Sequence, residues 1–123
     1  SHLAEGRATE GRIALVASIE QEIVGAILAT PEDTSSVRIR ELFVATAAQR
    51  RGIGTRLLDT TAERAAASGH GELSTDTLSS GGPRRFFEAC GFHVHGPSPY
   101  SPERVVMRRS VVSASGRNHV TGP

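Results

Sequence analysis

The sequence predicts a mixed α/β (α+β) fold in which a β-hairpin is followed by a parallel strand–helix–strand unit. Two apolar, β-rich runs, 13–19 and 23–29, are separated by three polar residues, as in a hairpin. A third such run, 37–44, precedes a helical stripe of apolar residues at three- and four-residue steps, and a further strand, 72–77, follows that stripe. Because crossovers of this kind are right-handed, the strands on either side of the helix are expected to lie parallel.

Length and composition predict one domain over residues 1–123, with its core between residues 12 and 109. The chain has 123 residues, of which 37% are hydrophobic and 22% are charged, as in an ordinary soluble globular protein. The segments 1–11 and 111–123 are expected to be flexible, with 3–11 as coil. A net charge of +1 gives no strong field for nucleic acid, so nucleic acid is not an expected partner.

The same survey predicts a cytoplasmic protein without a membrane partner. No stretch approaches the roughly 20 apolar residues of a membrane span, and no signal segment is evident. Cys90 is the single cysteine and cannot form an internal disulfide. His93 and His95 lack further ligands nearby, so no metal is expected.

The first strands carry two local irregularities. Gly25 lies inside the strand 23–29, where a glycine often marks a bulge or a close approach. In the strand 37–44, apolar residues occupy odd positions at first and even positions at 42 and 44. One core face can receive both sets only if an extra residue is inserted, so a β-bulge is predicted near 40–41. The alternative is a sheet that is covered on both faces.

The later elements are set by glycine and proline. The helix over 52–68 stops at Gly69, and Pro83 opens a second helix over 83–89 at its favoured first-turn position. The stretch 93–102 contains three prolines and is expected to be irregular. The apolar residues of 104–109 then predict a final strand.

The candidate binding feature is the start of the helix 52–68. A helix N-terminus has unpaired N–H groups and a partial positive charge, so it can hold a phosphate. Gly52 and Gly54 allow the backbone to approach an anion, and Arg50 and Arg51 add positive charge. A plain turn followed by a solvated helix start is the alternative. The third glycine of the dinucleotide fingerprint and the Gly-Lys-Ser/Thr of a P-loop are both missing.

Two segments resemble motifs of the GNAT superfamily of N-acetyltransferases. Gln49, Gly52 and Gly54 match its acetyl-CoA pyrophosphate loop, Gln/Arg-x-x-Gly-x-Gly/Ala, and residues 86–92 (FFEACGF) are similar to its F-Y-x-x-x-G-F signature. The two motifs stand in the family's order, separated by a helix and a strand, and the resemblance covers residues 12–109. It implies a twisted, mostly antiparallel mixed sheet around the central parallel unit, with the final strand antiparallel to its neighbours.

The resemblance also implies an activity and a coenzyme site. The chain is expected to be an acyltransferase that uses acetyl-CoA as co-substrate, needs no metal, and acetylates a primary amine of a small molecule or peptide by direct attack. Backbone groups at the end of the strand 37–44 would pair with pantetheine, and amides at 50–55 would hold the pyrophosphate. The implied coenzyme-binding residues are Phe43, Val44, Arg50, Arg51, Gly52, Ile53, Gly54, Thr55 and Ser80.

Two catalytic candidates follow from the chemistry of amine acetylation, which needs a base for the ammonium and a proton for the thiolate. A bulge near residue 41 would direct Glu41 toward the cleft as the base; the alternative is a surface carboxylate paired with Arg38 or Arg40. The family's frequent tyrosine acid is Phe87 here. Tyr100 is therefore the candidate acid, beside water and the serines at 79 and 80, with a surface aromatic as the alternative.

The resemblance leaves two further expectations. Family members place a strand and helices before the first strand identified here, and those helices form one wall of the acceptor site, whereas this sequence has only residues 1–11 there. A fragment, a shortened chain or a subunit completed by its partner would each account for this. The uncovered sheet predicts a homodimer. The alternative function is a non-catalytic acyl-CoA-binding module.

Overall fold

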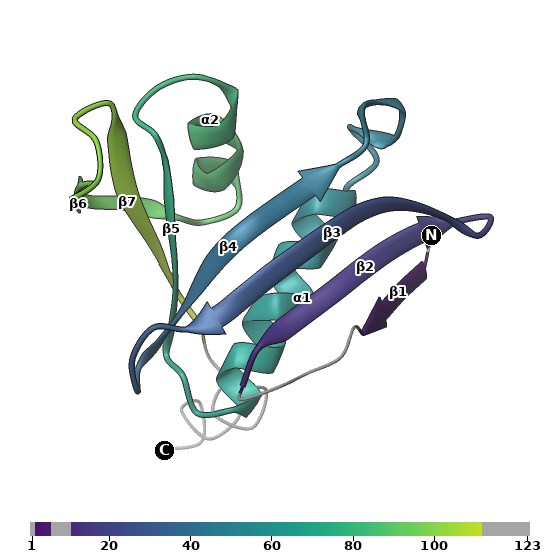
Figure 1. The fold of residues 1–123 in the computed structure, drawn as a ribbon, viewed down its shortest axis with the longest axis horizontal. Coiled ribbons are helices and arrows are strands. Elements are labelled where there is room, and N and C mark those ends of the chain that lie inside the picture. Colours follow the sequence, from purple (N-terminus) through teal and green to yellow (C-terminus); the bar gives the residue numbers. More distant parts are fainter. Residues whose placement is uncertain (1, 6–10, 112–123) are drawn as a thin grey trace, which may run out of the picture.

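A computed structural model describes residues 2–5 and 11–111 of the chain. Within these ranges, seven strands form one sheet in the order β1-β2-β3-β4-β5-β7-β6, together with two α-helices (Figure 1). The elements are β1 (His2–Glu5), β2 (Ile13–Ile19), β3 (Glu22–Pro31), β4 (Ser36–Val44), the 3-10 turn η1 (Thr46–Ala48), α1 (Ile53–Ala67), β5 (Glu72–Leu78), α2 (Gly82–Ala89), β6 (His93–Pro97) and β7 (Arg104–Ser110). The β4–β5 pair is parallel and the other pairs are antiparallel, which confirms the predicted fold class.

The parallel pair joins two halves of the sheet that diverge. β4 and β5 are in register at three positions only, Ser36 with Glu72, Val37 with Leu73 and Arg38 with Ser74. Beyond them β4 continues to Val44 and β5 to Leu78, and Figure 1 shows the two strands separating into a V. Among the described strands, none therefore pairs with the facing backbone edge of β4 along its second half.

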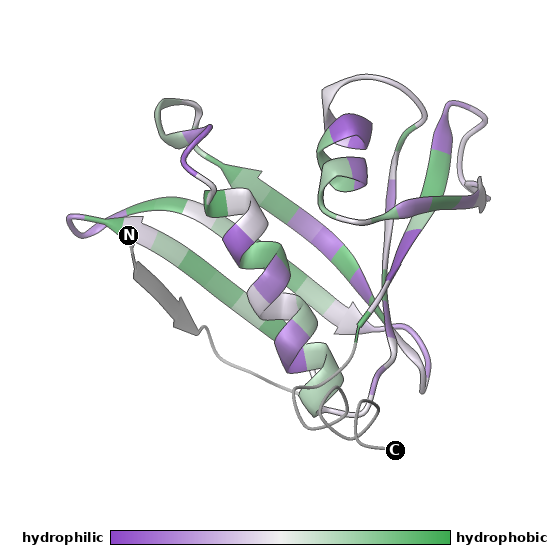
Figure 2. Ribbon diagram, turned by 180° about the vertical axis from the view of Figure 1, so that it is seen from behind, coloured by the Kyte–Doolittle hydropathy of each residue, from purple (hydrophilic) through white to green (hydrophobic). Residues whose placement is uncertain are grey.

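The core lies between the sheet and α1, which crosses β2, β3 and β4 on one face (Figures 1 and 2). Green hydrophobic and purple hydrophilic residues alternate along α1 in Figure 2, as an amphipathic helix requires. Leu57 and Leu58 are fully buried on its inner side. Among the described helices, none is long and apolar enough to span a membrane.

The predicted bulge in β4 is confirmed. Leu28 pairs with Glu41, but its neighbour Ala29 pairs with Ile39, so Arg40 is the extra residue. Val37 and Ile39 are buried before the bulge, whereas Leu42 and Val44 face the same side after it and are partly buried.

Gly25 marks both a bulge and a close approach. The pairing of β2 with β3 shifts by one residue next to it, between Ala17 and Ser18. A Cβ on Gly25 would lie 3.0 Å from Cγ2 of Ile53 and 3.1 Å from the carbonyl oxygen of Phe43. The missing side chain therefore lets the first turn of α1 lie directly on β3.

Gly25→Ala is expected to lower the free energy of unfolding by about 1–3 kcal/mol, because a methyl group there overlaps backbone as well as side chains. Gly71→Ala is the matched control, since a Cβ at Gly71 meets no atom within 4 Å. Urea unfolding of both variants gives the comparison. Equal stability of the two variants would contradict the close packing of α1 on β3.

Two edge strands differ from the sequence expectations. Residues 3–11 were expected to be coil, and this is wrong for 3–5, because His2–Glu5 pairs antiparallel with β2. The stretch 93–102 was expected to be irregular, yet His93–Pro97 pairs with β7. Main-chain hydrogen bonds form both pairings, so the sequence shows no alternation of apolar and polar side chains that would predict these strands. Of the tail 111–123 only Val111 is described, and it is buried; the rest of that expectation lies outside the described residues.

Candidate active site

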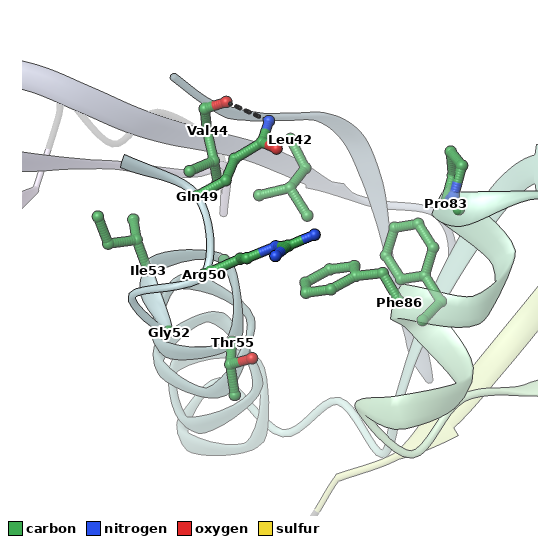
Figure 3. A pocket seen from close by; sticks show the side chains of 12 residues that line it. Leu42, Val44, Gln49, Arg50, Gly52, Ile53, Thr55, Pro83 and Phe86 are labelled. Carbon is green, nitrogen blue, oxygen red and sulfur yellow. Dashed lines mark hydrogen bonds between the residues drawn. The ribbon is translucent and has the colours of Figure 1, made fainter. Parts of the chain in front are cut away.

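A cleft of about 660 Å³ opens between the end of β4, the start of α1 and the start of α2 (Figure 3). Arg50 is the one charged side chain in its lining, which contains no carboxylate. The lining residues are Leu42, Val44, Gln49, Arg50, Gly52, Ile53, Gly54, Thr55, Gly82, Pro83, Phe86 and Phe87. The cleft is thus an apolar slot with a cationic end.

The N-terminus of α1 faces this cleft without a capping side chain. Its N-cap, Gly52, has φ 76°, and the first turn contains no acidic residue. The N–H of Arg56 donates to the carbonyl of Gly52 at 3.0 Å, so the N–H groups of residues 53–55 precede the first helical hydrogen bond. These donors and the helix dipole together form a seat for an anion.

The second helix adds a similar end to the same cleft. α2 begins at Gly82 and Pro83, and it also has neither a capping side chain nor an acid in its first turn. Two helix N-termini with partial positive charge therefore border one cavity. An extended ligand with negative charge fits this field.

The loop before α1 is held by a side-chain bond. Nε2 of Gln49 donates to the carbonyl oxygen of Val44 at 3.2 Å, which ties the loop to the end of β4 (Figure 3). Arg50 has a positive φ of 70°, and Figure 3 shows its side chain extending into the cleft toward Phe86. A non-glycine residue held in this conformation is strained, and such strain gathers at functional sites.

The rings of Phe86 and Phe87 line the cleft on the α2 side. A Cβ on Gly54 would lie 3.0 Å from Cζ of Phe86, so the glycine lets this ring pack against the first turn of α1. Phe87 is 7% exposed and meets Phe86 and Phe92 edge-on, with centroids 5.4 and 5.2 Å apart. Position 87 therefore offers the cleft a hydrocarbon edge and no proton donor.

The structure brings most of the predicted coenzyme-binding residues together. Those in the lining are Val44, Arg50, Gly52, Ile53, Gly54 and Thr55. Phe43, Arg51 and Ser80 are exposed and lie outside the lining. Phe43 is paired with Ala26, and its side chain is on the sheet face away from α1, opposite to Leu42 and Val44.

Six lining residues were not among the predicted coenzyme-binding residues: Leu42, Gln49, Gly82, Pro83, Phe86 and Phe87. Gln49, Phe86 and Phe87 stand in the two motifs, and the sequence also held a signal for two others. Leu42 shares its side of β4 with Val44, and Pro83 was assigned to a helix start. Their common cavity depends on how far β4 and β5 separate, which no local pattern contains.

Glu41 lies on the sheet face opposite α1. It is exposed, follows the bulged Arg40, and pairs with Leu28 on a neighbouring strand. Its expected surface partners are engaged elsewhere: Arg38 lies 3.3 Å from a carboxylate oxygen of Glu32, and Nε of Arg40 donates to Oγ1 of Thr30 at 2.9 Å. In the described part of the chain, no ion pair involves Glu41.

Tyr100 lines a second cavity, of about 260 Å³, together with Arg38, Ile39, Arg40, Asp76 and Arg104. The guanidinium carbon of Arg38 lies 5.5 Å from the centre of the Tyr100 ring, which is otherwise exposed. This cavity and the cleft share no lining residue. They border successive parts of β4, residues 38–40 and 42–44, where the strand leaves β5.

Asp76 anchors the second cavity. Its carboxylate accepts hydrogen bonds from Oγ of Ser98 and Nε of Arg104, each at 2.5 Å, and Nη2 of Arg38 lies 3.8 Å away. Burial raises the pKa of Asp76, but the bonds from Ser98 and Arg104 and the charges of Arg104 and Arg38 outweigh it, so the net pKa lies below 3.8. The group is therefore ionised at neutral pH.

Asp76→Asn is expected to lower the melting temperature at neutral pH, because it leaves two guanidinium groups facing an uncharged amide. A lowered pKa in the folded state stabilises above the ordinary value of 3.8, and this stabilisation is lost as the pH falls through the lowered pKa. Melting curves from about pH 7 to about pH 2.5 should therefore converge for variant and wild type. A constant gap would contradict the ion-pair account.

No group of three or more potential metal-ligating side chains occurs among the described residues.

Comparisons with solved structures give the same fold. An aminoglycoside 6'-acetyltransferase type Ii is 26% identical, with a TM-score of 0.73 over 83% of this chain and 70% of that chain. An aminoglycoside 6'-N-acetyltransferase complexed with coenzyme A is 22% identical, with a TM-score of 0.73 over 83% and 74% of the two chains. A GNAT family acetyltransferase from Elizabethkingia anophelis with acetyl-CoA bound is 20% identical, with a TM-score of 0.71 over 82% and 77%. A search of curated proteins finds no match.

The uncapped N-terminus of α1, at the opening of the V, is the kind of helix end that binds an anion. The acetyltransferase (GNAT) domain family matches residues 10–94, so the chain belongs to the GNAT acetyltransferases. The resemblance carried by residues 49–54 and 86–92 is thereby confirmed, and acyl transfer is the activity class of the chain.

Proposed function

We propose that the chain transfers the acetyl group of acetyl-CoA to a primary amine of a small molecule or peptide. The observation that carries this proposal is the uncapped N-terminus of α1, which borders an apolar cleft at the point where β4 leaves β5. Two fold neighbours were solved with coenzyme A or acetyl-CoA bound, which supports the same ligand here.

In this proposal the coenzyme lies along the cleft from α1 to the V. The amides of residues 50–55 hold the pyrophosphate, and the side chains of Arg50 and Arg51 add charge at that end. The pantetheine amides pair with the free backbone edge at Phe43 and Val44, as an added strand would. Ser80, in the exposed loop before α2, is the side-chain donor proposed for the pantetheine.

The acceptor amine approaches from the face that carries Glu41. The ammonium first loses a proton through water to the Glu41 carboxylate, and its nitrogen then attacks the thioester carbonyl carbon. A C–N bond forms, the nitrogen gives up its second proton to water, the C–S bond breaks, and the thiolate takes up a proton. Because the thiolate is only mildly basic, positioning of the two substrates can supply much of the rate.

Tyr100 is the proposed donor of that last proton, since Phe87 has none to give. Its ring lies beside Arg38 in the second cavity, next to the stretch of β4 that carries Glu41. Water and the serines at 79 and 80 are the competing donors. Tyr100→Phe should lower kcat if Tyr100 donates the proton, and should leave kcat unchanged if water or a serine does.

A specific observation favours the alternative, an acyl-CoA-binding module without turnover. Phe87 is buried among Phe86 and Phe92 where many family members carry an acidic hydroxyl. Such a module would bind the coenzyme in the same cleft but would release no CoA in the presence of amines.

The proposed setting is the cytoplasm, and the proposed assembly is a homodimer. The sheet face away from α1 exposes Phe43 to 54%, and Ile23 on the adjacent strand is exposed to 62%. Covering these side chains by a second copy would remove apolar surface from water. Light scattering at tens of micromolar is expected to give twice the mass of one chain, and a monodisperse monomer would overturn this assembly.

Two measurements together test the function. Calorimetric titration with CoA reports coenzyme binding, and release of free thiol from acetyl-CoA with a panel of amines reports turnover. Binding with amine-dependent thiol release is the expected result. Binding without release supports the module instead, and absence of both contradicts each of the two functions.

A further inference from the structure

The second cavity carries an excess of positive charge that the proposed coenzyme site does not use. Its lining contains three arginines, at 38, 40 and 104, but a single carboxylate, that of Asp76. The cavity opens beside the β4 residues that precede Glu41. A group that binds there lies next to the proposed base and the acceptor amine.

Both carboxylate oxygens of Asp76 are already engaged by the protein's own cations and donors. Arg104 holds one carboxylate oxygen at 2.5 Å, and the other oxygen accepts from Ser98 and lies 3.8 Å from Arg38. The Asp76 carboxylate therefore already accepts hydrogen bonds from the protein's own side chains. An ammonium group in the cavity would have to displace a guanidinium to reach it.

Arg40 is the arginine of this cavity whose terminal N–H groups can bind a ligand. Within the described ranges it forms no ion pair, and its one hydrogen bond runs from Nε to the Thr30 hydroxyl at 2.9 Å. A guanidinium has five N–H donors, so both terminal nitrogens remain available. They present the planar fork that matches a carboxylate or phosphate.

The β-bulge in β4 explains why Arg40 lies exposed beside Glu41. Because Arg40 is the extra residue of β4, it and Glu41 are both exposed on consecutive positions, whereas an ordinary strand would direct one of them into the core face. The same insertion therefore places a cation next to the proposed base. Glu32, the other nearby carboxylate, is already bonded to Arg38 at 3.3 Å.

We propose that the acceptor is an amine that also carries an oxyanion, a carboxylate or a phosphate, which Arg40 binds in the cavity between β4 and β5. This inference rests on the proposed function and names its substrate class. Arg38 and Arg104 contribute positive field from the two walls of that cavity. A polycationic acceptor such as an aminoglycoside would meet like charges here, so the acceptor class differs from the one named for two of the fold neighbours.

Matched acceptor pairs test this proposal by turnover. L-alanine, β-alanine and γ-aminobutyrate are each compared with the corresponding carboxamide, phosphoethanolamine with ethanolamine, and kanamycin is added as the polycation. We expect kcat/KM to be about 10- to 100-fold higher for the anionic member of a pair, the gain of a charge-assisted bond. The carboxamide of an α-amino acid has the less basic amine, so protonation biases this comparison against the proposal.

Arg40→Gln is the diagnostic variant, because glutamine can still donate to Thr30 while it lacks the charge. It should remove the preference for the anionic member of each pair and leave kcat/KM for the uncharged member within about threefold. Arg64→Gln is the control, since Arg64 lies in the last turn of α1, on the other face of the sheet from the cavity. Comparison of the carboxylate acceptors with phosphoethanolamine shows which oxyanion the protein prefers.

Binding to the CoA complex decides the proposal independently of turnover. N-acetyl-β-alanine and its carboxamide are titrated into wild type and Arg40→Gln with saturating CoA. Tighter binding of the carboxylate to wild type alone supports the inference even if no amine is acetylated, in which case the proposed function fails by itself. Equal binding of acid and carboxamide, or turnover of amines without charge preference, overturns the inference and leaves the function standing.

Discussion

Gly52→Asp is expected to abolish measurable binding of CoA, with a loss of at least about 100-fold in affinity. Gly52 lines the cleft with a positive φ, and a Cβ there would meet no atom within 4 Å, so the new side chain has room to stand in the anion seat. A carboxylate at this point competes with the pyrophosphate for the same amides and repels it.

Gly52→Asn is the matched control for that experiment. Asparagine and aspartate have the same size and tolerate a left-handed backbone similarly well, so the two variants differ mainly in charge. Calorimetric titration with CoA should show that Asn retains most of the wild-type affinity. Equal losses in both variants would show that bulk or backbone strain is responsible, and no loss in either would place the phosphate elsewhere.

Glu41→Gln is expected to lower kcat by about 10²- to 10⁴-fold with little change in the KM for acetyl-CoA, because a base acts on the amine and does not hold the coenzyme. Glu22→Gln, at an exposed position on β3, is the control. An unchanged kcat would leave Glu41 as a surface carboxylate.

Much of the fold could be predicted because its central elements carry side-chain signals. The change of phase between Ile39 and Leu42 announced the bulge, and Gly25 announced the contact between β3 and α1. Each signal exists because a buried face accepts only one register of the strand or one size of residue.

The edge strands and the second cavity could not be predicted for the opposite reason. β6 has mostly exposed side chains, so its pairing with β7 leaves no alternation in the sequence. The bonds of Asp76 to Ser98 and Arg104 join residues 22 and 28 positions apart. Such contacts depend on the full topology of β5, β6 and β7, and no local spacing encodes them.

The candidate site likewise contains a part that could be predicted from the sequence and a part that could not. The anion seat at Gly52 follows from a local rule about helix N-termini, and the structure puts it in the cleft. Phe43 and Ser80 were chosen by resemblance, and their side chains lie outside the lining.

A crystal structure of the chain with bound CoA tests the central claim most directly. The account predicts pyrophosphate oxygens about 2.7–3.2 Å from the amide nitrogens of residues 52–55, and pantetheine amides paired with the backbone of β4 at Phe43 and Val44. The sulfur should then lie in the V between β4 and β5. CoA bound at any other surface, with the start of α1 empty, would contradict the account.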